Sequence, residues 1–430
     1  MSFLTWEILL TFLLLRLLMI ISSPLLSHRE FLSTSFIQIN NARFILSILC
    51  VLRIFWAIRC IPRFLQERSN KSLSLLILVL FLSLQMFFYI RKILILYIMF
   101  ELSVIPIFGI IIGWGYQRER LNARLSLIFY TLTASMPFLR ILLWMVNTNF
   151  CSNLNCVMRL RAVNLSSLSN LSIFCLIIAF AVKLPIFGVH IWLPKAHVEA
   201  PVFGSIVLAS ILLKLGRYGL WLFIPLVYSF KRVNIWVSIS IVGAVIISVI
   251  CLRLRDLKII IAYSSVRHIG LVLIALIIVQ SLGAYGGLLL ILAHGVRSSA
   301  IFLFSYFIYQ ANFSRRMILR KGVLVWSRLL PLLWFLILIT NIAAPPTFNL
   351  VSEILIIRTI INLRRFNILP LVLIILLSRA YSFIIYRSTI QGTTILVNNN
   401  YVVKSSEIIN TINHLIWGFL MVLAIGLINF

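Results

Sequence analysis

The sequence predicts an all-α polytopic membrane protein with about 13 transmembrane helices. Of its 430 residues, 62% are hydrophobic and only 11% are charged, whereas soluble domains carry roughly 25% charged residues. The apolar runs are also continuous rather than alternating, which excludes a transmembrane β-barrel. The polar stretches between the runs are loop-sized, so we expect no soluble domain.

Each apolar run is long enough for a transmembrane helix, which needs ~20 residues. The connections are short, so consecutive helices are expected to pack as antiparallel neighbours. The first run follows the initiating methionine almost directly, so we expect no cleaved signal peptide. The expected spans are 3–22, 43–60, 72–90, 93–115, 124–146, 168–190, 202–227, 234–252, 259–280, 283–310, 329–361, 366–386 and 409–428.

Two of these spans are interrupted by proline, which removes a helical hydrogen bond and clashes with the preceding turn. One contains Lys183 and Pro185, and the other is broken at 341–347 (Asn-Ile-Ala-Ala-Pro-Pro-Thr). We therefore expect two inverted five-helix repeats, each with a proline-broken helix. Matched broken helices in inverted halves are typical of an ion path near the bilayer midplane. Two incidental kinks remain the alternative.

We expect the chain to consist of four parts, with one break in each of the two middle parts. Residues 1–92 form N-terminal transmembrane helices, and residues 93–227 form the first half of the repeat. Residues 228–386 form the second half, and residues 387–430 form a C-terminal loop and helix.

Six ionisable side chains inside the spans are candidates for a proton path. A charged side chain at mid-membrane costs about 2.5–3.5 kcal/mol on insertion scales, so such residues are usually functional and partnered. Lysine, glutamate and histidine exchange protons, whereas arginine stays protonated. A carboxylate moving towards or away from a lysine changes that lysine's proton affinity. The six residues are Glu101, Lys183, Lys214, His268, His294 and Glu353.

Alternative interpretations of these ionisable residues stay open. Glu101 and Lys183 would form a switch if they touch, which the sequence does not show. A buried histidine is more often structural, so this alternative holds for His268 and His294. Outside the six, Lys258 starts a span, and simple snorkelling is the alternative to a functional role for it.

The net charge is +29, because the chain has 38 lysines and arginines and only nine aspartates and glutamates. A voltage sensor would repeat arginine at regular spacing on one helix, and a nucleic-acid-binding protein would cluster it on a soluble face. Here the arginines are single and scattered, so neither class fits. Those inside apolar runs are Arg16, Arg53, Arg140, Arg217, Arg267, Arg297, Arg358 and Arg379.

No cofactor motif is visible in the chain. It lacks a Gly-x-Gly-x-x-Gly loop after a strand, a P-loop, a cysteine set for an iron–sulfur cluster and histidines at haem spacing. We therefore expect no cofactor and no metal site in this chain.

Seven segments carry a recognisable residue pattern. They are Phe-Glu-Leu-Ser-Val-Ile-Pro (100–106), Gly-Trp-Gly-Tyr-Gln-x-Glu-Arg-Leu-Asn-Ala (113–123), Phe-Tyr-Thr-Leu-Thr-Ala-Ser (129–135), Val-Lys-Leu-Pro-Ile-Phe-Gly-Val-His-Ile-Trp-Leu-Pro-Lys-Ala-His-Val-Glu-Ala-Pro (182–201), Leu-Leu-Lys-Leu-Gly (212–216), Asp-Leu-Lys-Ile-Ile-Ile-Ala-Tyr-Ser-Ser (256–265) and Ala-His-Gly (293–295). Together they resemble the antiporter-like core subunits of respiratory complex I, over about residues 95–390.

The resemblance implies a place in a larger machine. Such subunits contribute to proton translocation across the inner mitochondrial membrane, coupled to electron transfer from NADH to ubiquinone in other subunits. NADH, FMN, iron–sulfur clusters and ubiquinone are expected in those partners. The implied contacts are other membrane-arm subunits, including neighbouring antiporter-like ones, and lipids, with no nucleic acid. A stand-alone cation/proton antiporter and an inactive scaffold are the alternatives.

The resemblance also assigns roles. The family's essential glutamate on an early helix, lysine on the first broken helix, lysine one helix later and glutamate on the second broken helix fall on Glu101, Lys183, Lys214 and Glu353. The central histidines fall on His268 and His294.

The sequence departs from the family in two ways. One N-terminal helix before Glu101 is expected to be missing. In addition, Arg217, Arg267 and Arg297 stand where the family has serine, glycine or threonine. Several animal mitochondrial codes read AGA and AGG as serine and ATA as methionine. We hypothesise that a standard-code translation placed arginine and isoleucine at such codons, which would also explain Ile269 and the low count of 9 methionines.

Overall fold

A computed structural model of the chain describes a bundle of helices. The predicted spans 3–22 and 43–60 lie outside the described residues, apart from four positions in the second. The described residues are 46–47, 50, 54, 70–115, 119–148, 152–154, 170–227, 233–278, 281–312, 314–319, 321–323, 329–363, 367–392 and 405–423.

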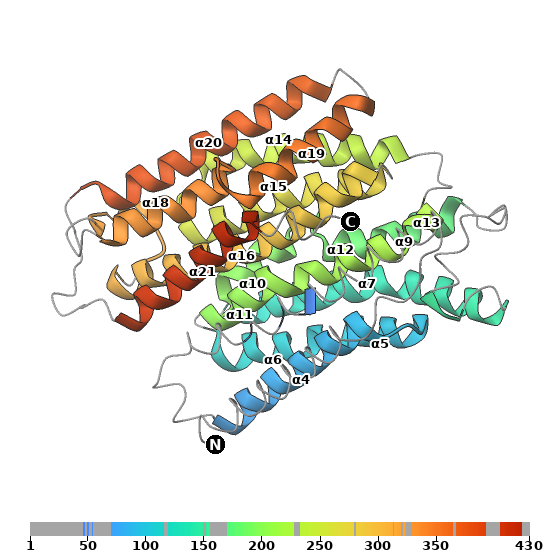
Figure 1. The fold of residues 1–430 in the computed structure, drawn as a ribbon. Helices are drawn as coiled ribbons and strands as arrows, with labels where there is room; N and C mark the ends of the chain where they lie inside the picture. Colours follow the sequence, from blue (N-terminus) through green and yellow to red (C-terminus); the bar gives the residue numbers. More distant parts are fainter. Residues whose placement is uncertain are drawn as a thin grey trace. The chain divides into compact units, whose positions relative to one another are not determined.

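All regular secondary structure in these residues is helical, apart from two isolated backbone bridges. Within them, eight spans are long and apolar enough to cross a membrane, which confirms the all-α membrane class. In chain order (Figure 1) the helices are α4 (Asn70–Tyr89), α5 (Ile93–Leu102), α6 (Val104–Trp114), α7 (Arg120–Asn147), α9 (Asn170–Lys183), α10 (Trp192–Glu199), α11 (Val202–Val207), η2 (Leu208–Leu212), α12 (Leu213–Leu222), α13 (Ile224–Val227), α14 (Val233–Arg253), α15 (Leu257–Ile277), α16 (Ser281–Asn312), η3 (Met317–Leu319), α18 (Leu329–Ile342), α19 (Phe348–Leu363), α20 (Ile368–Ile390) and α21 (Ser405–Leu423).

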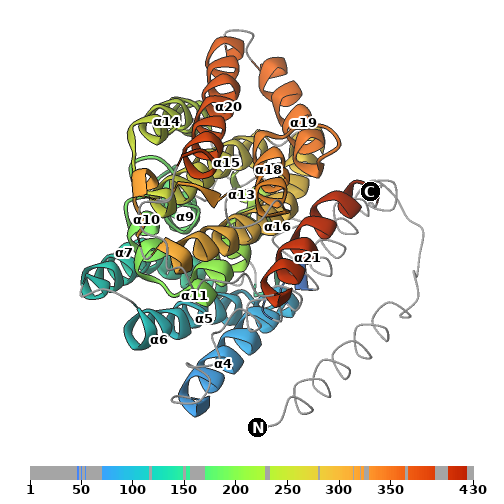
Figure 2. The same ribbon diagram turned by 90° about the vertical axis from the view of Figure 1, so that its left-hand side faces the viewer.

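Helix α16 forms the centre of the described bundle. It packs against α11, α15, α18, α19 and α21 (Figure 2), and nearly all of its side chains are buried. By contrast, α20 exposes Leu369, Leu376 and Phe383. A helix that is apolar all round is typical of a protein core or a membrane span. The polar residues of α16 therefore lie in the interior, where they can face only other helices.

The first predicted break is observed around Pro185. Helix α9 ends at Lys183, and α10 begins at Trp192. Pro185 has no N–H, so the carbonyl of Ala181 instead accepts a hydrogen bond from the Ile186 amide at 3.2 Å. The indole of Trp192 donates to the Val182 carbonyl at 3.0 Å. These bonds satisfy backbone groups that the break releases inside the bundle.

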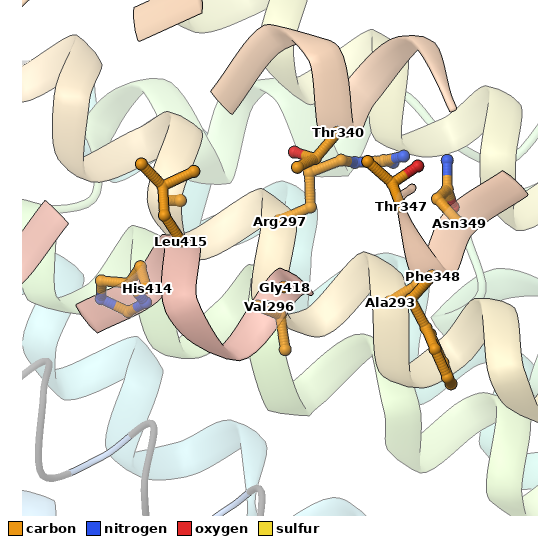
Figure 3. A pocket seen from close by; sticks show the side chains of 11 residues that line it. Ala293, Val296, Arg297, Thr340, Thr347, Phe348, Asn349, His414, Leu415 and Gly418 are labelled. Atoms are coloured by element: carbon orange, nitrogen blue, oxygen red, sulfur yellow. The ribbon is translucent and has the colours of Figure 1, made fainter. Parts of the chain in front are cut away.

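The second predicted break separates α18 from α19, so residues 329–361 form two helices rather than one. Ala343 adopts a positive φ of 59° at the break. The Thr347 amide donates to the Ala344 carbonyl at 2.9 Å and closes a turn before α19. Figure 3 shows Thr340 and Thr347, on either side of the break, close to Arg297 of α16.

Two irregularities were not predicted. The span 93–115 is interrupted at Ser103, between α5 and α6, because Pro106 cannot donate to the carbonyl of Leu102. The span 202–227 contains a π-helical turn, η2, directly before Lys214. Such turns are frequent at functional sites, and both irregularities lie next to ionisable residues predicted as candidates.

Candidate functional site

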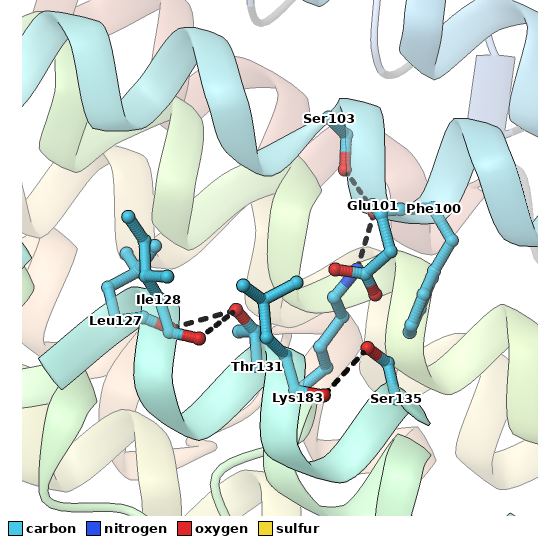
Figure 4. A network of polar contacts seen from close by, with 9 residues as sticks. Phe100, Glu101, Ser103, Leu127, Ile128, Thr131, Ser135 and Lys183 are labelled. Atoms are coloured by element: carbon cyan, nitrogen blue, oxygen red, sulfur yellow. Dashed lines mark hydrogen bonds and ion pairs between the residues drawn. The ribbon is translucent and has the colours of Figure 1, made fainter. Parts of the chain in front are cut away.

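Glu101 and Lys183 form a buried ion pair between α5 and the end of α9. The Lys183 Nζ lies 3.4 Å from a Glu101 carboxylate oxygen, and the lysine is 5% exposed. It also donates to the Phe100 carbonyl at 2.5 Å and lies 3.0 Å from the centroid of the Phe100 ring. Figure 4 shows the lysine extending towards Glu101. The ammonium is thus paired, which a buried charge requires.

Lys214 contacts His294 across the α12–α16 interface. The Lys214 Nζ lies 3.2 Å from His294 Nδ1 and donates to the Ala209 carbonyl of η2 at 2.5 Å. Both side chains are almost fully buried. An ammonium can only donate, so Nδ1 accepts and the neutral ring carries its proton on Nε2.

His268 continues this line to the second broken helix. Its Nδ1 lies 3.2 Å from a carboxylate oxygen of Glu353 on α19. The rings of His268 and His294 are 6.1 Å apart between centroids, too far for a direct hydrogen bond. A water molecule can bridge two rings whose centroids are separated by this distance.

Close packing of α9 against α12 brings the two groups of residues towards each other. A Cβ placed on Gly216 would lie 3.2 Å from the Lys183 Cβ, and Lys214 is two positions earlier on the same segment. The structure thus joins all six predicted residues into two sets. One is Glu101 with Lys183, and the other is Lys214, His294, His268 and Glu353.

The three arginines beside this line lack the partners that buried cations need. Arg217 is fully buried, and none of its three guanidinium nitrogens bonds to a described residue. The same holds for Nε and Nη1 of Arg297 and for Nε of Arg267. The Nη2 atom of Arg267 also contacts the ring of His268 closely. Uncompensated buried charge is strongly unfavourable.

Two polar residues near the site were not predicted from the sequence. Asn349 donates to a Glu353 oxygen at 3.2 Å, and His414 of α21 lies in the interior. A polar residue within an apolar run was the available signal for each. Lys258, at the start of α15, donates from its Nζ to the Val198 and Ala200 carbonyls at 3.1 and 2.8 Å. It therefore caps the C-terminal end of α10.

The fold and site define a class: a multi-pass helical membrane protein whose broken helices carry a buried lysine and a buried glutamate. Residues 91–378 match the family described as NADH:quinone oxidoreductase/Mrp antiporter, transmembrane. The chain belongs to this family, which confirms the resemblance seen in its motifs.

Named relatives agree with this membership. NADH-ubiquinone oxidoreductase chain 4 of Aedes aegypti is 44% identical over 298 residues, which cover 69% of this chain and 66% of the relative. The chain thus spans slightly less than two thirds of that protein. The protein of the same name from Scyliorhinus canicula is 41% identical over 329 residues, covering 73% of this chain and 70% of the relative.

A solved structure shares the fold. A chain of "Respiratory complex I from Thermus thermophilus with bound NADH" superposes with a TM-score of 0.79 at 21% identity. The superposition covers 91% of this chain and 82% of that one.

Proposed function

We propose that this chain is an antiporter-like core subunit in the membrane arm of respiratory complex I, in the inner mitochondrial membrane. It contributes to proton translocation, while electrons pass from NADH through FMN and iron–sulfur clusters to ubiquinone in partner subunits. The proposal rests on the buried line from Lys214 through His294 and His268 to Glu353, in which the two histidines are not in direct hydrogen-bond contact. Its neighbours are the other membrane-arm subunits and lipids.

The line can move a proton because each member both accepts and donates. Lys214 gives a proton to His294 Nδ1, and the opposite ring nitrogen releases one towards His268. From His268, the proton passes to the Glu353 carboxylate at 3.2 Å. The rings lie 6.1 Å apart between centroids, and a water that bridges their nitrogens would complete the relay. No step requires a cofactor in this chain.

The Glu101–Lys183 pair serves as the switch. The 3.4 Å contact favours a charged lysine. Separating the two groups changes the proton affinity of Lys183. Helix α12 packs on α9 at Gly216. A change in the position of Lys183 therefore affects the segment that carries Lys214. The pair thereby couples events at α5 to the longer line.

The antiporter-like halves are proposed to be inverted repeats of five helices, within a protein of about 13 spans. The range 93–227 alone holds four spans, so we assign α4 to the first half. Broken helix α9–α10 is then the fourth span of that half. Broken helix α18–α19 is likewise the fourth span of the half that runs from α14 to α20.

We also propose that positions 217, 267 and 297 are serine in the native protein. A serine at each site would remove a buried charge that has too few partners and would leave a hydroxyl that can bind water. Mass spectrometry of the chain purified from its own mitochondria tests this directly. Peptides that carry serine at the three positions support the proposal, and peptides cut by trypsin after arginine contradict it.

The function is tested on the assembled membrane enzyme with Lys183→Met. We expect NADH-driven proton uptake into vesicles to fall by at least about tenfold, because the switch has lost its titrating group. Unchanged uptake would favour a scaffold role. If the chain does not copurify with NADH:ubiquinone oxidoreductase activity, and exchanges cations for protons alone in liposomes, it is a stand-alone antiporter instead.

A further inference from the structure

Two side chains contact the same oxygen of Glu353, at the end of the buried line. Its Oε1 atom lies 3.2 Å from Nδ1 of His268 on α15 and 3.2 Å from Nδ2 of Asn349 on α19. An ionised carboxylate can only accept, so Nδ1 of His268 carries a hydrogen in this arrangement. All three side chains are buried. One oxygen of Glu353 is therefore held by two donors that come from different helices.

The second break sets the position of Asn349. The Leu350 amide donates to the Thr347 carbonyl at 3.1 Å, where α19 begins. Asn349 is the second residue of this helix, and Glu353 follows four residues later. Residues at this spacing lie on the same face of a helix. The start of α19 at the break thus places the amide beside the carboxylate.

The amide of Asn349 makes no other hydrogen bond with the described residues. Its Nδ2 donates to Glu353, whereas its buried Oδ1 has no partner among them. A buried polar atom without a partner is unfavourable. An apolar side chain of similar size would fill the same space without that penalty. The contact with Glu353 therefore explains the asparagine better than packing does.

Three arginines also interact with Glu353 electrostatically, at longer range than these two contacts. They are Arg267, Arg297 and Arg379. Positions 267 and 297 are proposed to be serine in the native protein, and Arg379 is exposed on α20. Neither donor to Oε1 is one of these arginines, so both donors remain with serine at positions 267 and 297.

We propose that Asn349 is a positioning residue for Glu353, which holds Oε1 towards His268 and favours the ionised carboxylate that accepts the proton. The proposal rests on the proposed function of the buried line. Protonated His268 passes the proton on Nδ1 to Oε1, which yields a neutral ring and a carboxylic acid. The reverse transfer restores the imidazolium and the carboxylate. Asn349 neither gains nor loses a proton in this step.

Loss of the amide would slow the transfer in two ways. A hydrogen bond donated to a carboxylate stabilises its charged form, so without Asn349 the neutral acid is favoured and the acceptor is occupied more of the time. The carboxyl group is also free to turn Oε1 away from His268. Both effects leave the buried line with fewer productive contacts at its end.

The test is Asn349→Leu in the assembled enzyme, reconstituted into vesicles. Leucine keeps the approximate size of the side chain and removes the amide donor. We expect NADH-driven proton uptake to fall by roughly tenfold or more, the order of effect that loss of one hydrogen bond to a charged group has. The matched control is Asn312→Leu, because Asn312 is also buried and its Nδ2 bonds to no described residue. Uptake in this control should equal that of wild type.

Infrared difference spectroscopy separates positioning from packing. A carboxyl C=O band that is stronger in Asn349→Leu, and that disappears when Glu353→Gln is added, belongs to protonated Glu353. We expect this band, which a purely structural asparagine would not produce. Asn349→Gln keeps an amide donor and should restore most of the uptake. Asn349→Ala removes the amide without adding an apolar branch, and it provides the same measurements if the leucine variant does not assemble.

Parallel measurement of Glu353→Gln distinguishes the positioning role from the path. If Glu353→Gln stops uptake while Asn349→Leu has wild-type uptake and lacks the band, the positioning role is overturned and the buried line stands. Slow uptake in Asn349→Leu without the band also overturns it, because the asparagine then acts through packing alone. If Glu353→Gln leaves uptake unchanged, the proposed function itself is contradicted.

Discussion

Individual residues at this site are held by backbone carbonyls as much as by opposite charges. Lys183 bonds to the Phe100 carbonyl and Lys214 to the Ala209 carbonyl, each at 2.5 Å. Both carbonyls lie next to a helix irregularity, at Ser103 and at η2. A backbone carbonyl accepts a hydrogen bond from the ammonium while carrying no net charge of its own.

The Glu101–Lys183 pair gives a quantitative prediction at this scale. Lys183→Met leaves a mostly buried carboxylate without its cation and should destabilise the assembled enzyme by about 3–5 kcal/mol. Adding Glu101→Gln should recover much of that loss without restoring proton uptake. The measurement is a double-mutant cycle on the thermal inactivation midpoint, with Lys71→Met, on the exposed surface of α4, as the control. Additive effects would show that the two residues do not interact.

The sequence alone indicated which residues form the line but not how they are held. All six candidates were visible because ionisable side chains stand out in apolar runs. Asn349 was missed because its amide is neutral, whereas His414 was missed although it is an ionisable residue in an apolar run. The carbonyl partners were not predictable, since they depend on where a helix opens. The guanidinium of Arg217, which has no hydrogen-bond partner among the described residues, gives structural support to an anomaly that the composition had already raised.

At the scale of elements, the position of the site depends on close contact between helices α9 and α12. Gly219 faces the Phe180 ring, and a Cβ at that position would overlap it. Phe180 in turn packs against Phe138 and Phe223, with ring centroids 5.0 and 5.7 Å apart. The aromatic cluster therefore fixes the distance between the segments that carry Lys183 and Lys214.

Gly219→Ala tests this contact. We expect a loss of about 1–3 kcal/mol in stability, because extra atoms in a packed core force shifts, together with slower proton uptake. Gly113→Ala is the matched control, since a Cβ there meets no atom within 4 Å. Thermal inactivation of both variants in the assembled enzyme provides the measurement. Equal behaviour of the two variants would mean that α9–α12 packing does not position the site.

The C-terminal end of α10 provides a second prediction. Lys258 donates to two carbonyls there, and Glu199 pairs with Arg315 at 3.4 Å. Lys258→Met should weaken this end by about 1.5–3 kcal/mol, the usual contribution of a charged hydrogen bond. Amides of α10 should then exchange hydrogen faster by mass spectrometry, whereas exposed Lys195→Met should leave exchange unchanged. Unaltered exchange in Lys258→Met would refute the capping role.

The sequence located the described spans to within a few residues and marked both proline breaks. It missed the interruption at Ser103 and the π-helical turn, because neither disrupts hydrophobicity. Pro106 was visible, but a proline near the middle of a span can bend a helix or end it, and the neighbouring helices decide between these outcomes. Apolar content thus predicts where a span lies better than it predicts the regularity of that span.

For the whole molecule, the described bundle buries its polar line among apolar helices. Helix α16 supplies His294 at the centre, whereas α20 exposes large apolar side chains at the periphery. A low-dielectric surrounding strengthens hydrogen bonds within the line and penalises any group left unpaired. Membership of the antiporter family, the fold and the line agree, although the partner subunits could be inferred only through the resemblance.

The most direct test of the proton path is the number of protons translocated per NADH oxidised by the assembled enzyme when Glu353 is replaced by glutamine. Glutamine preserves the shape of the side chain and removes its exchangeable proton. Glu119→Gln serves as the control, because Glu119 is exposed at the start of α7. We predict that the ratio, or coupled turnover as a whole, falls in Glu353→Gln alone. A wild-type ratio at wild-type turnover in Glu353→Gln would contradict it.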